Sequence, residues 1–321
     1  MLRFAGLKML YPITNPLIVL VGPTAVGKSR IAIEIARQFD GEIVSADSRL
    51  FYRGMNIGTA KPCNDDRRLI KHHLIDIAEP DEIISLRIFQ QKAQESIKEI
   101  VKINKLPILV GGTGQYIHAV TEGWAIPPQK PNEKLRNLLT EWVDEIGSEE
   151  IYQKLVLLDP VAAKKIDPRN VRRTIRALEV IFGTGKQFSQ QRRKIGTKYN
   201  LKTIGLFLPR EVLYQRIDER IDQMISDGLI EEVERLLSQG FSVDLPSMSA
   251  IGYHEIAAYL QNKITLENAI MLMRRRTRQF VRRQSNWFKS NDPSIHWFVV
   301  SERIVEEIIK FIQSPESWIS E

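Results

Sequence analysis

An eight-residue segment, residues 22–29, has the residue types and the spacing of a loop that holds phosphate groups. Its sequence, GPTAVGKS, fits the pattern G-x-x-x-x-G-K-[ST], and we call it the phosphate loop. Backbone N–H groups at a helix start point at an anion, Lys28 adds a full positive charge, and the Ser29 hydroxyl can reach Mg²⁺. We therefore predict a phosphate-bearing ligand, Mg²⁺ as cofactor with Ser29 as its ligand, and binding by Gly22, Thr24, Ala25, Val26, Gly27, Lys28 and Ser29.

A carboxylate, Asp47, follows the next apolar segment at 42–46. The carboxyl ends of strands in an open α/β sheet face the ligand crevice, so Asp47 and the three residues after it are expected beside the phosphates. An Asp that ends a strand is more often a cap or turn residue. Its position relative to the phosphate loop is what favours a chemical role.

A glycine-rich segment, 111–114, follows another apolar run and contains Thr113. Glycines let a backbone approach a ligand closely, and Thr113 would offer a hydroxyl there. A tight turn explains the same glycines equally well, so this motif alone does not distinguish the two.

The elements that must position these residues alternate between short apolar strands and amphipathic helices. We predict an α/β fold, a P-loop NTPase-like core with a parallel sheet and an inserted helical domain. Residues 51–80 are expected to form a long ordered loop in which His72 and His73 dock structurally. Strands are expected at 17–21, 42–46, 107–110, 203–208 and 295–300, and helices at 31–36, 89–102, 211–226, 229–238, 251–260, 266–288 and 302–312.

The character of the chain changes from 124 to about 200, where prolines interrupt the pattern and amphipathic stretches follow around 135–146, 151–158 and 171–181. We predict that 124–200 is an inserted helical domain that binds a polyanionic partner. The core then comprises 17–123 and 201–321, and residues 1–16 form an N-terminal extension.

Positive charge is concentrated in two windows of a chain whose net charge is +7. Residues 164–198 contain 11 Lys and Arg against 2 acids, and residues 274–289 contain 7 against none. Such local concentrations indicate a polyanionic partner. A salt-bridged helical face is the alternative, and the scarcity of acids nearby in the sequence disfavours it.

Aromatic residues alternate with the arginines of the second window. Basic side chains hold phosphates, and aromatic side chains such as Trp287 can stack on unpaired bases. For Phe280 we expect a core position instead. In an earlier helix, Arg216 and Arg220 lie one turn apart near Asp218 and Asp222, and a salt-bridged surface helix explains that pattern by itself.

Composition limits the remaining classes. The single cysteine, Cys63, excludes a disulfide framework and a cysteine zinc site, and fits a reducing compartment. No apolar run approaches the about 18 residues of a spanning helix, so we expect no membrane partner and a cytoplasmic location. Residues 1–16 carry Arg3 and Lys8 without an acid, and a plain extension is favoured over a targeting signal.

Taken in order, eight motifs make the chain resemble the tRNA dimethylallyltransferase family over about residues 17–287. The lack of cysteines near the C-terminus, where eukaryotic relatives often carry a zinc finger, implies the bacterial type. The motifs are GPTAVGKS (22–29), SADS (45–48), YRGMNIGTAKP (52–62), HHLID (72–76), GGTG (111–114), RALEV (176–180), IGY (251–253) and the RQ and W of 283–287.

The resemblance implies a Mg²⁺-dependent prenyltransferase that modifies tRNA. Its members move a dimethylallyl group from dimethylallyl diphosphate to the exocyclic amine (N6) of the adenosine 3′-adjacent to the anticodon. The substrates would be tRNAs that read codons beginning with U, and diphosphate would be released. The implied partners are the tRNA anticodon stem-loop and dimethylallyl diphosphate, and the protein would act as a monomer.

The resemblance also assigns roles to residues. Asp47 would be the general base, while Thr113 and Arg220 would contact the reacting centre and the diphosphate. At position 50 Leu replaces the Gln of many relatives, and at 254 His replaces the common Lys or Arg. The implied tRNA contacts are Asp47, Ser48, Arg49, Leu50, Thr113, Arg136, Arg172, Arg173, Thr174, Ile175, Arg176, Gly252, Tyr253, Arg282, Arg283, Gln284 and Trp287.

Residue chemistry agrees with these roles. The adenine amine is a poor nucleophile, and a carboxylate within hydrogen-bond reach can remove its proton as the new bond forms. Lys28, Arg220 and Mg²⁺ would stabilise charge on the departing diphosphate. The base must leave the anticodon-loop stack, at a cost of about a few kcal/mol that contacts elsewhere must offset.

Two other classes of protein share parts of this pattern. A P-loop small-molecule or nucleoside kinase, indicated by the phosphate loop alone, would consume ATP and would not need the basic windows. A non-catalytic RNA-binding protein would bind tRNA in a salt-sensitive manner without chemistry.

Overall fold

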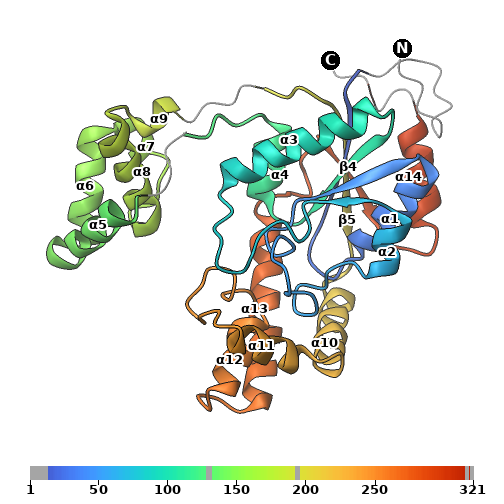
Figure 1. Cartoon of the computed structure of the whole chain (residues 1–321). Helices are drawn as coiled ribbons and strands as arrows, with labels where there is room; N and C mark the ends of the chain where they lie inside the picture. Colours follow the sequence, from blue (N-terminus) through green and yellow to red (C-terminus); the bar gives the residue numbers. More distant parts are fainter. Residues whose placement is uncertain (1–13, 128–131, 192–195, 315–317, 319–321) are drawn as a thin grey trace. The chain divides into compact units, whose positions relative to one another are not determined.

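The chain forms two compact units in a computed structural model that describes residues 14–127, 132–191, 196–314 and 318 (Figure 1). The first unit comprises Met1–Thr121 and Thr197–Glu321, and the second is Glu122–Gly196. Asn200 already pairs with Pro16 in the sheet, so the core resumes a little before the expected residue 201, and it begins at Pro16. Residues 1–13 of the expected extension lie outside the described residues.

A parallel sheet of six strands forms the centre of the first unit, in the order β3-β2-β4-β1-β5-β6. Every neighbouring pair is parallel, as predicted, and the central strand β1 is buried along its whole length. In register, Ile18 of β1 lies between Ile108 and Lys202. The strands are β1 (Pro16–Val21), β2 (Gly41–Ser45), β3 (His72–His73), β4 (Leu106–Gly111), β5 (Asn200–Phe207) and β6 (Ile295–Val299).

Helices cover both faces of this sheet because the chain crosses it in both directions. The connection from β1 to β2 through α1 (Lys28–Gln38) runs across the sheet in the opposite direction to the one from β3 to β4 through α3 (Leu86–Lys102). Right-handed crossovers in opposite directions place their helices on opposite faces. Figure 1 shows α1 with α14 (Ile304–Gln313) on one face and α3 with α4 (Gly114–Thr121) on the other.

Four helices occupy the chain between β5 and β6. α13 packs against both α10 and α12. The expectation that Phe280 of α13 lies in the core is wrong, because Phe280 is half-buried beneath the guanidinium of Arg283, whereas Phe288 is buried. The four are α10 (Arg210–Ser226), α11 (Leu229–Ser238), α12 (Tyr253–Leu260) and α13 (Leu266–Ser285).

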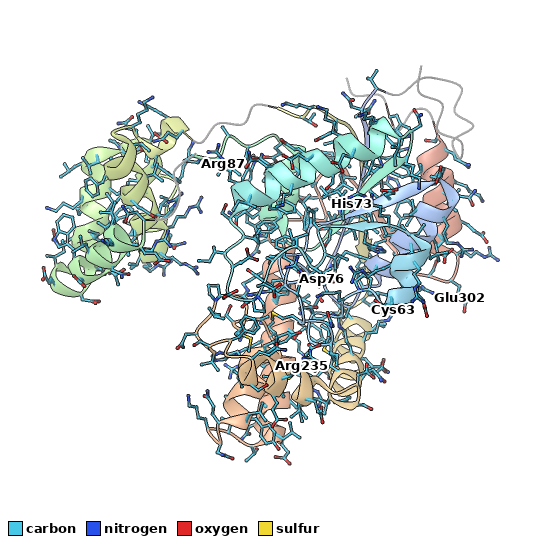
Figure 2. All side chains as sticks on the ribbon, in the orientation of Figure 1. Cys63, His73, Asp76, Arg87, Arg235 and Glu302 are labelled. Carbon is cyan, nitrogen blue, oxygen red and sulfur yellow. The ribbon has the colours of Figure 1, made fainter. Side chains whose placement is uncertain are left out.

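The region 51–80 is ordered, as expected, but it is not only a loop. It contains the short helix α2 (Asn64–Leu69) and the edge strand β3. Asp76 binds the Lys61 Nζ at 2.6 Å and the Arg67 Nη1 at 2.7 Å, and His73 Nε2 lies 2.7 Å from a carboxylate oxygen of Glu42. Figure 2 labels Asp76 and His73 among the side chains of the chain. These contacts support the structural docking role predicted for the histidine pair.

The second unit has an apolar core of its own, formed by buried side chains such as Ile151, Leu155 and Leu178. Two of its helices, each of 14 residues, begin at side-chain caps, Asn132 and Asn170. Across the residues that the structure describes, no helix in either unit is long and apolar enough to cross a membrane. The helices are α5 (Glu133–Ile146), α6 (Ser148–Leu158), α7 (Pro160–Ala163), α8 (Val171–Thr184) and α9 (Phe188–Gln191).

Candidate active site

Three chemistry-bearing segments meet at the carboxyl edge of the sheet. They follow β1, β2 and β4, which are neighbours or next neighbours in the sheet and parallel, so their ends face the same side. A cavity of about 50 Å³ there is lined by Lys28, Ser29, Asp47, Gly111 and other residues. The phosphate loop and the Asp47 carboxylate therefore face one cavity, as the sequence led us to expect.

The phosphate loop has the backbone shape of an anion cradle. Ala25, with φ of 63°, and Gly27, with φ of 100°, lie in the left-handed region and curve the chain sharply into α1. No side chain caps the N-terminus of α1, and its first turn holds no acid. The first N–H groups of a helix lack partners within the helix, so these groups are available to a phosphate.

Lys28 lies across the loop that precedes it. Its Nζ donates to the carbonyl oxygens of Gly22 (3.0 Å) and Pro23 (2.7 Å). Burial lowers the pKa of Lys28 to about 8; the Asp47 carboxylate opposes that shift and the Arg220 guanidinium adds to it. A bound diphosphate would supply the negative charge that stabilises the protonated form.

The two carboxylate oxygens of Asp47 have different surroundings. Its Oδ1 accepts the Arg49 backbone N–H at 3.0 Å, which is the turn role considered for this residue. Its Oδ2 accepts no hydrogen bond from the residues that the structure describes. The turn fixes the carboxylate while one oxygen remains available to a substrate.

Arg220 reaches this site from α10. Burial lowers the pKa of Arg220, and the Asp47 carboxylate acts to raise it, so the two charges lie close enough to interact. Its neighbours Asp218 and Asp222 are paired with arginines of α13 instead. The salt-bridged surface helix considered from sequence is therefore correct for the aspartates and incorrect for Arg220.

The residues at this edge fit a Mg²⁺ ion. The Ser29 hydroxyl and the Asp47 carboxylate line the same cavity and supply the oxygen ligands that Mg²⁺ prefers. Among the described residues, no group of three or more His, Cys, Asp or Glu could hold a metal. Mg²⁺ commonly takes its other ligands from substrate phosphates and water.

The glycines of 111–114 allow close approach by the end of α13. A Cβ on Gly112 would lie 2.1 Å from Gln284 Nε2, and one on Gly114 would lie 2.2 Å from Trp287 Cγ. Thr113, between them, is half-buried at the start of α4, and its hydroxyl makes no hydrogen bond to the described part of the chain. Close packing, rather than a tight turn, explains these two glycines.

Thr24 and Gln284, which the sequence assigned to ligand binding, form a hydrogen bond with each other inside the protein. Gln284 is buried; its Nε2 donates to the Gly112 carbonyl at 3.1 Å, and its Oε1 accepts the Thr24 N–H at 2.9 Å. The Thr24 N–H is thus turned towards Gln284, and phosphate binding by Thr24 stays a prediction.

Arg49 joins two of the segments that the family resemblance linked to tRNA. Its Nη1 donates to the Pro246 carbonyl at 2.8 Å and its Nη2 to the Ser249 hydroxyl at 3.3 Å. Four residues of the implied tRNA-contact set have buried side chains, and their contacts with tRNA stay predictions: Thr174, Ile175, Tyr253 and Gln284.

Glu232 is a site-supporting residue that no sequence pattern revealed. Its buried carboxylate accepts N–H groups of Asn56 and Ile57, each at 3.0 Å, and the Tyr253 hydroxyl at 2.6 Å. It thereby ties the 52–62 motif to the 251–253 motif. In the sequence, Glu232 is indistinguishable from any other glutamate of a helix. Only its tertiary contacts identify it as a residue that supports the site.

The first basic window is partly neutralised inside the second unit. The Glu179 carboxylate is fully buried and binds Arg136 and Arg176, each at 2.9 Å. Burial acts to raise the pKa of Glu179, but hydrogen bonds from Arg136, the Asn132 N–H and Arg176 outweigh it and lower the pKa. Arg172 and Arg173 are exposed at the first turn of α8, where they are open to a partner.

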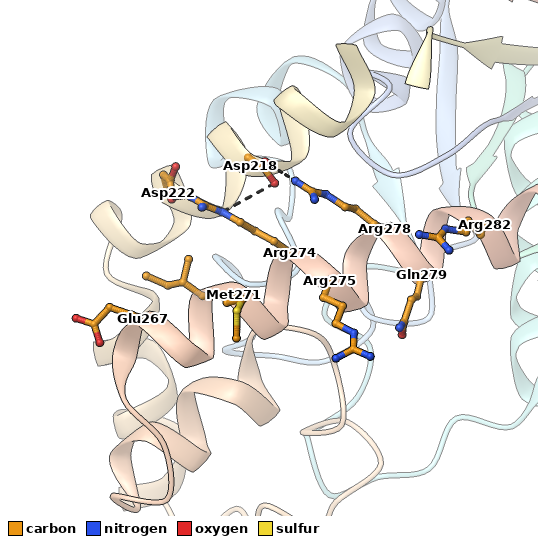
Figure 3. A pocket seen from close by; sticks show the side chains of 10 residues that line it. Asp218, Asp222, Glu267, Met271, Arg274, Arg275, Arg278, Gln279 and Arg282 are labelled. Carbon is orange, nitrogen blue, oxygen red and sulfur yellow. Dashed lines mark hydrogen bonds and ion pairs between the residues drawn. The ribbon is translucent and has the colours of Figure 1, made fainter. Parts of the chain in front are cut away.

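Acids from other helices neutralise three arginines of the second window. Arg274 binds Asp222 and Arg278 binds Asp218, each at 2.5 Å, and Arg276 binds the buried Glu255. Figure 3 shows Arg275 pointing away from the two aspartates, in a groove of about 850 Å³ that Arg282 also lines. Arg275 and Arg282 form no ion pair with the described residues. The salt-bridged alternative thus holds for part of this helix and fails for the rest.

Comparisons with known proteins agree on one family. The family model described as IPP transferase matches residues 50–291. A curated tRNA dimethylallyltransferase of Roseiflexus sp. (strain RS-1) is 50% identical over 274 residues, which cover 85% of this chain and 90% of that protein. Another, from Thermomicrobium roseum, is 45% identical over 288 residues, 90% of this chain and 87% of that protein.

Solved structures of similar proteins cover most of the chain. The tRNA isopentenylpyrophosphate transferase of Bacillus halodurans is 40% identical with a TM-score of 0.70, and the match covers 93% of this chain and 96% of that one. A eukaryotic dimethylallyltransferase described as acting on tRNA is 30% identical with a TM-score of 0.77, covering 90% of this chain and 75% of that one.

Proposed function

Because the chain belongs to the IPP transferase family, we propose that it transfers a dimethylallyl group from dimethylallyl diphosphate to tRNA. The acceptor is the exocyclic N6 amine of the adenosine 3′-adjacent to the anticodon, in tRNAs that read codons beginning with U, and diphosphate is released. The relatives named in the comparisons support this reading and give no support to a P-loop kinase.

One observation of the geometry carries the proposal. Lys28, Ser29 and Asp47 line a single cavity, and the charge of Arg220 acts on both Lys28 and Asp47. Three cation or hydroxyl groups suited to a diphosphate thus lie beside one carboxylate suited to a proton. An acceptor amine and a diphosphate ester are the two reactants that this set can serve together.

The roles follow from the atoms that remain open. Asp47 Oδ2 accepts the proton of the adenine amine as nitrogen attacks the allylic carbon and the carbon–oxygen bond to diphosphate breaks. Lys28 and Arg220 stabilise the negative charge that grows on the diphosphate. Mg²⁺ held at Ser29 would neutralise further charge on the phosphate oxygens.

Exposed cations of both units bind the tRNA backbone in this proposal. Arg172 and Arg173 do so on the second unit, and Arg275, Arg282 and Arg283 on α13. Their contacts offset the cost of unstacking the target base, about a few kcal/mol. The protein would act in the cytoplasm as a monomer.

The test is direct. The protein is incubated with Mg²⁺, unmodified tRNA and labelled dimethylallyl diphosphate, and label on the RNA is measured and mapped by nucleoside digestion. We expect one labelled adenosine, next to the anticodon. A protein that labels no RNA contradicts the proposal, and ATP consumption stimulated by a small acceptor would indicate a kinase instead.

A further inference from the structure

A single buried side chain connects α13 to both loops of the candidate site. Gln284 is 5% exposed, and its amide lies between the phosphate loop and the 111–114 segment. The three positions are far apart in the sequence, since 260 residues separate Thr24 from Gln284 and 172 separate Gln284 from Gly112.

The two hydrogen bonds require an amide in one orientation. Thr24 offers an N–H and Gly112 offers a carbonyl oxygen, so only a group with one acceptor and one donor satisfies both. A flipped amide would set donor against donor and acceptor against acceptor. A Cβ at Gly112 would lie 2.1 Å from Gln284 Nε2, so residue 112 must also be small for the amide to lie there.

The Thr24 bond has a consequence for ligand binding. Thr24 lies inside the phosphate loop, and with its N–H held by Gln284 it cannot point that donor at a phosphate. The neighbouring residues Ala25 and Gly27 adopt their left-handed conformations next to this fixed point. Gln284 therefore holds one end of the curve whose open N–H groups receive the anion.

We propose that Gln284 is a positioning residue that sets the phosphate loop for the diphosphate group of the substrate, rather than a residue that contacts tRNA. This inference rests on the proposed function and reassigns one position of the tRNA-contact set. Both polar atoms of the Gln284 amide are already bonded inside the protein, and burial keeps them away from an RNA, whereas loss of those bonds frees the loop directly.

Gln284→Met tests the inference because it keeps length and volume and removes both hydrogen bonds. We expect the Kd for inorganic diphosphate with Mg²⁺ and the KM for dimethylallyl diphosphate to rise about tenfold, the size of one or two lost hydrogen bonds. The Kd for tRNA should change less than twofold. Gln91→Met, at an exposed position on α3, is the matched control and should leave all three unchanged.

A second pair of variants keeps the test independent of folding. Gly112→Ala places a methyl group against the Gln284 amide and should weaken diphosphate binding. In the double variant Gly112→Ala/Gln284→Ala the clash is gone, so the two effects should not add. Fully additive effects on diphosphate affinity would contradict a shared contact, and circular dichroism checks that each variant is folded.

Opposite results overturn the inference. If Gln284→Met weakens tRNA binding about tenfold and leaves diphosphate affinity at the wild-type value, then Gln284 contacts tRNA. If it changes neither affinity, the phosphate loop does not depend on Gln284. Wild-type protein that binds diphosphate but labels no tRNA contradicts the proposed transferase function alone, because the diphosphate measurements need no turnover.

Discussion

At the scale of single residues, the role of each side chain depends on which of its atoms remain open. Asp47 is both a turn residue and a candidate base because Arg49 engages Oδ1 and leaves Oδ2. Lys28 binds two carbonyls of its own loop, so its ammonium is oriented before a ligand arrives. Arg220 differs from its neighbours on α10 because its charge acts on Asp47 rather than on α13.

Asp47→Asn should separate binding from chemistry. The amide can still hold the turn through its oxygen, but it cannot accept a proton at neutral pH. We expect the turnover rate to fall by about 10²- to 10⁴-fold, the usual contribution of a general base, while the Kd for tRNA stays near wild type. Single-turnover labelling and filter binding measure the two. Equal loss of both would reject the base assignment, and exposed Asp65→Asn is the control.

The lowered pKa of Lys28 predicts that the affinity for diphosphate depends on pH. Its pKa is lowered to about 8 by burial, so the free protein loses this charge as pH rises through 8. Since diphosphate prefers the charged form, its apparent Kd should increase above pH 8, by up to about tenfold per pH unit. Titration calorimetry from pH 7 to 9.5 measures this. The Lys28→Met variant should bind diphosphate weakly, and its Kd should change little with pH over that range.

The same shift affects folding with a defined sign. Between pH 8 and the ordinary lysine value of 10.5, the unfolded chain binds more protons at Lys28 than the folded protein does. Without ligand, this residue therefore makes the free energy of unfolding rise with pH in that window. Lys28→Met should remove that rise, which denaturant titrations at several pH values can detect. A rise that persists unchanged would mean that Lys28 is not the group responsible.

At the scale of elements, α13 shows why a basic window is not a measure of free positive charge. Asp218 and Asp222 of α10 and Glu255 of α12 neutralise three of its arginines. Those acids lie tens of residues away in the sequence, so the window itself contains none of them. The exposed side with Arg275 and Arg282 (Figure 3) remains open to a polyanion, as does the exposed Arg283.

Arg275→Gln should weaken tRNA binding through charge alone. We expect a several-fold higher Kd and a smaller dependence of log Kd on log salt, by about 0.7 to 0.9 for one lost phosphate contact. Affinity for diphosphate should not change. Filter binding at several salt concentrations measures the slope. Arg303→Gln, an exposed arginine outside both windows, is the control, and an equal effect there would mean a non-specific loss of charge.

At the scale of the whole molecule, the chain is divided into two units with separate cores. The groups proposed for chemistry all belong to the first unit, whereas Arg172 and Arg173 belong to the second. A separate core lets each unit keep its own stability, so we expect the chain to unfold in more than one transition.

Diphosphate with Mg²⁺ should therefore stabilise one unit only. A ligand at 100 times its Kd adds about 2.7 kcal/mol to the state that binds it. In scanning calorimetry we expect two transitions, of which one moves to higher temperature with ligand. Two transitions that shift together would show that the units unfold as one. Lys28→Met weakens diphosphate binding, so it should abolish the rise in transition temperature. This variant serves as the control.

The sequence by itself determined the α/β class, the parallel strands and the phosphate loop. These follow from local patterns, since apolar runs, glycine spacing and helical periodicity need no distant partner to be read. The position of Asp47 beside the loop also followed, because parallel strands end at a common edge. The succession of motifs indicated the family, which the comparisons confirmed.

Only the tertiary structure decided which charges are free and which side chains are structural. The partners of Arg274, Arg276 and Arg278 come from other helices, and Gln284 acquires its role from two loops far away in the sequence. The sequence led us to expect Phe280 in the core, but Phe280 is half-buried and Phe288 is buried. Pairing and burial depend on contacts between distant segments, and no local pattern in the chain encodes those.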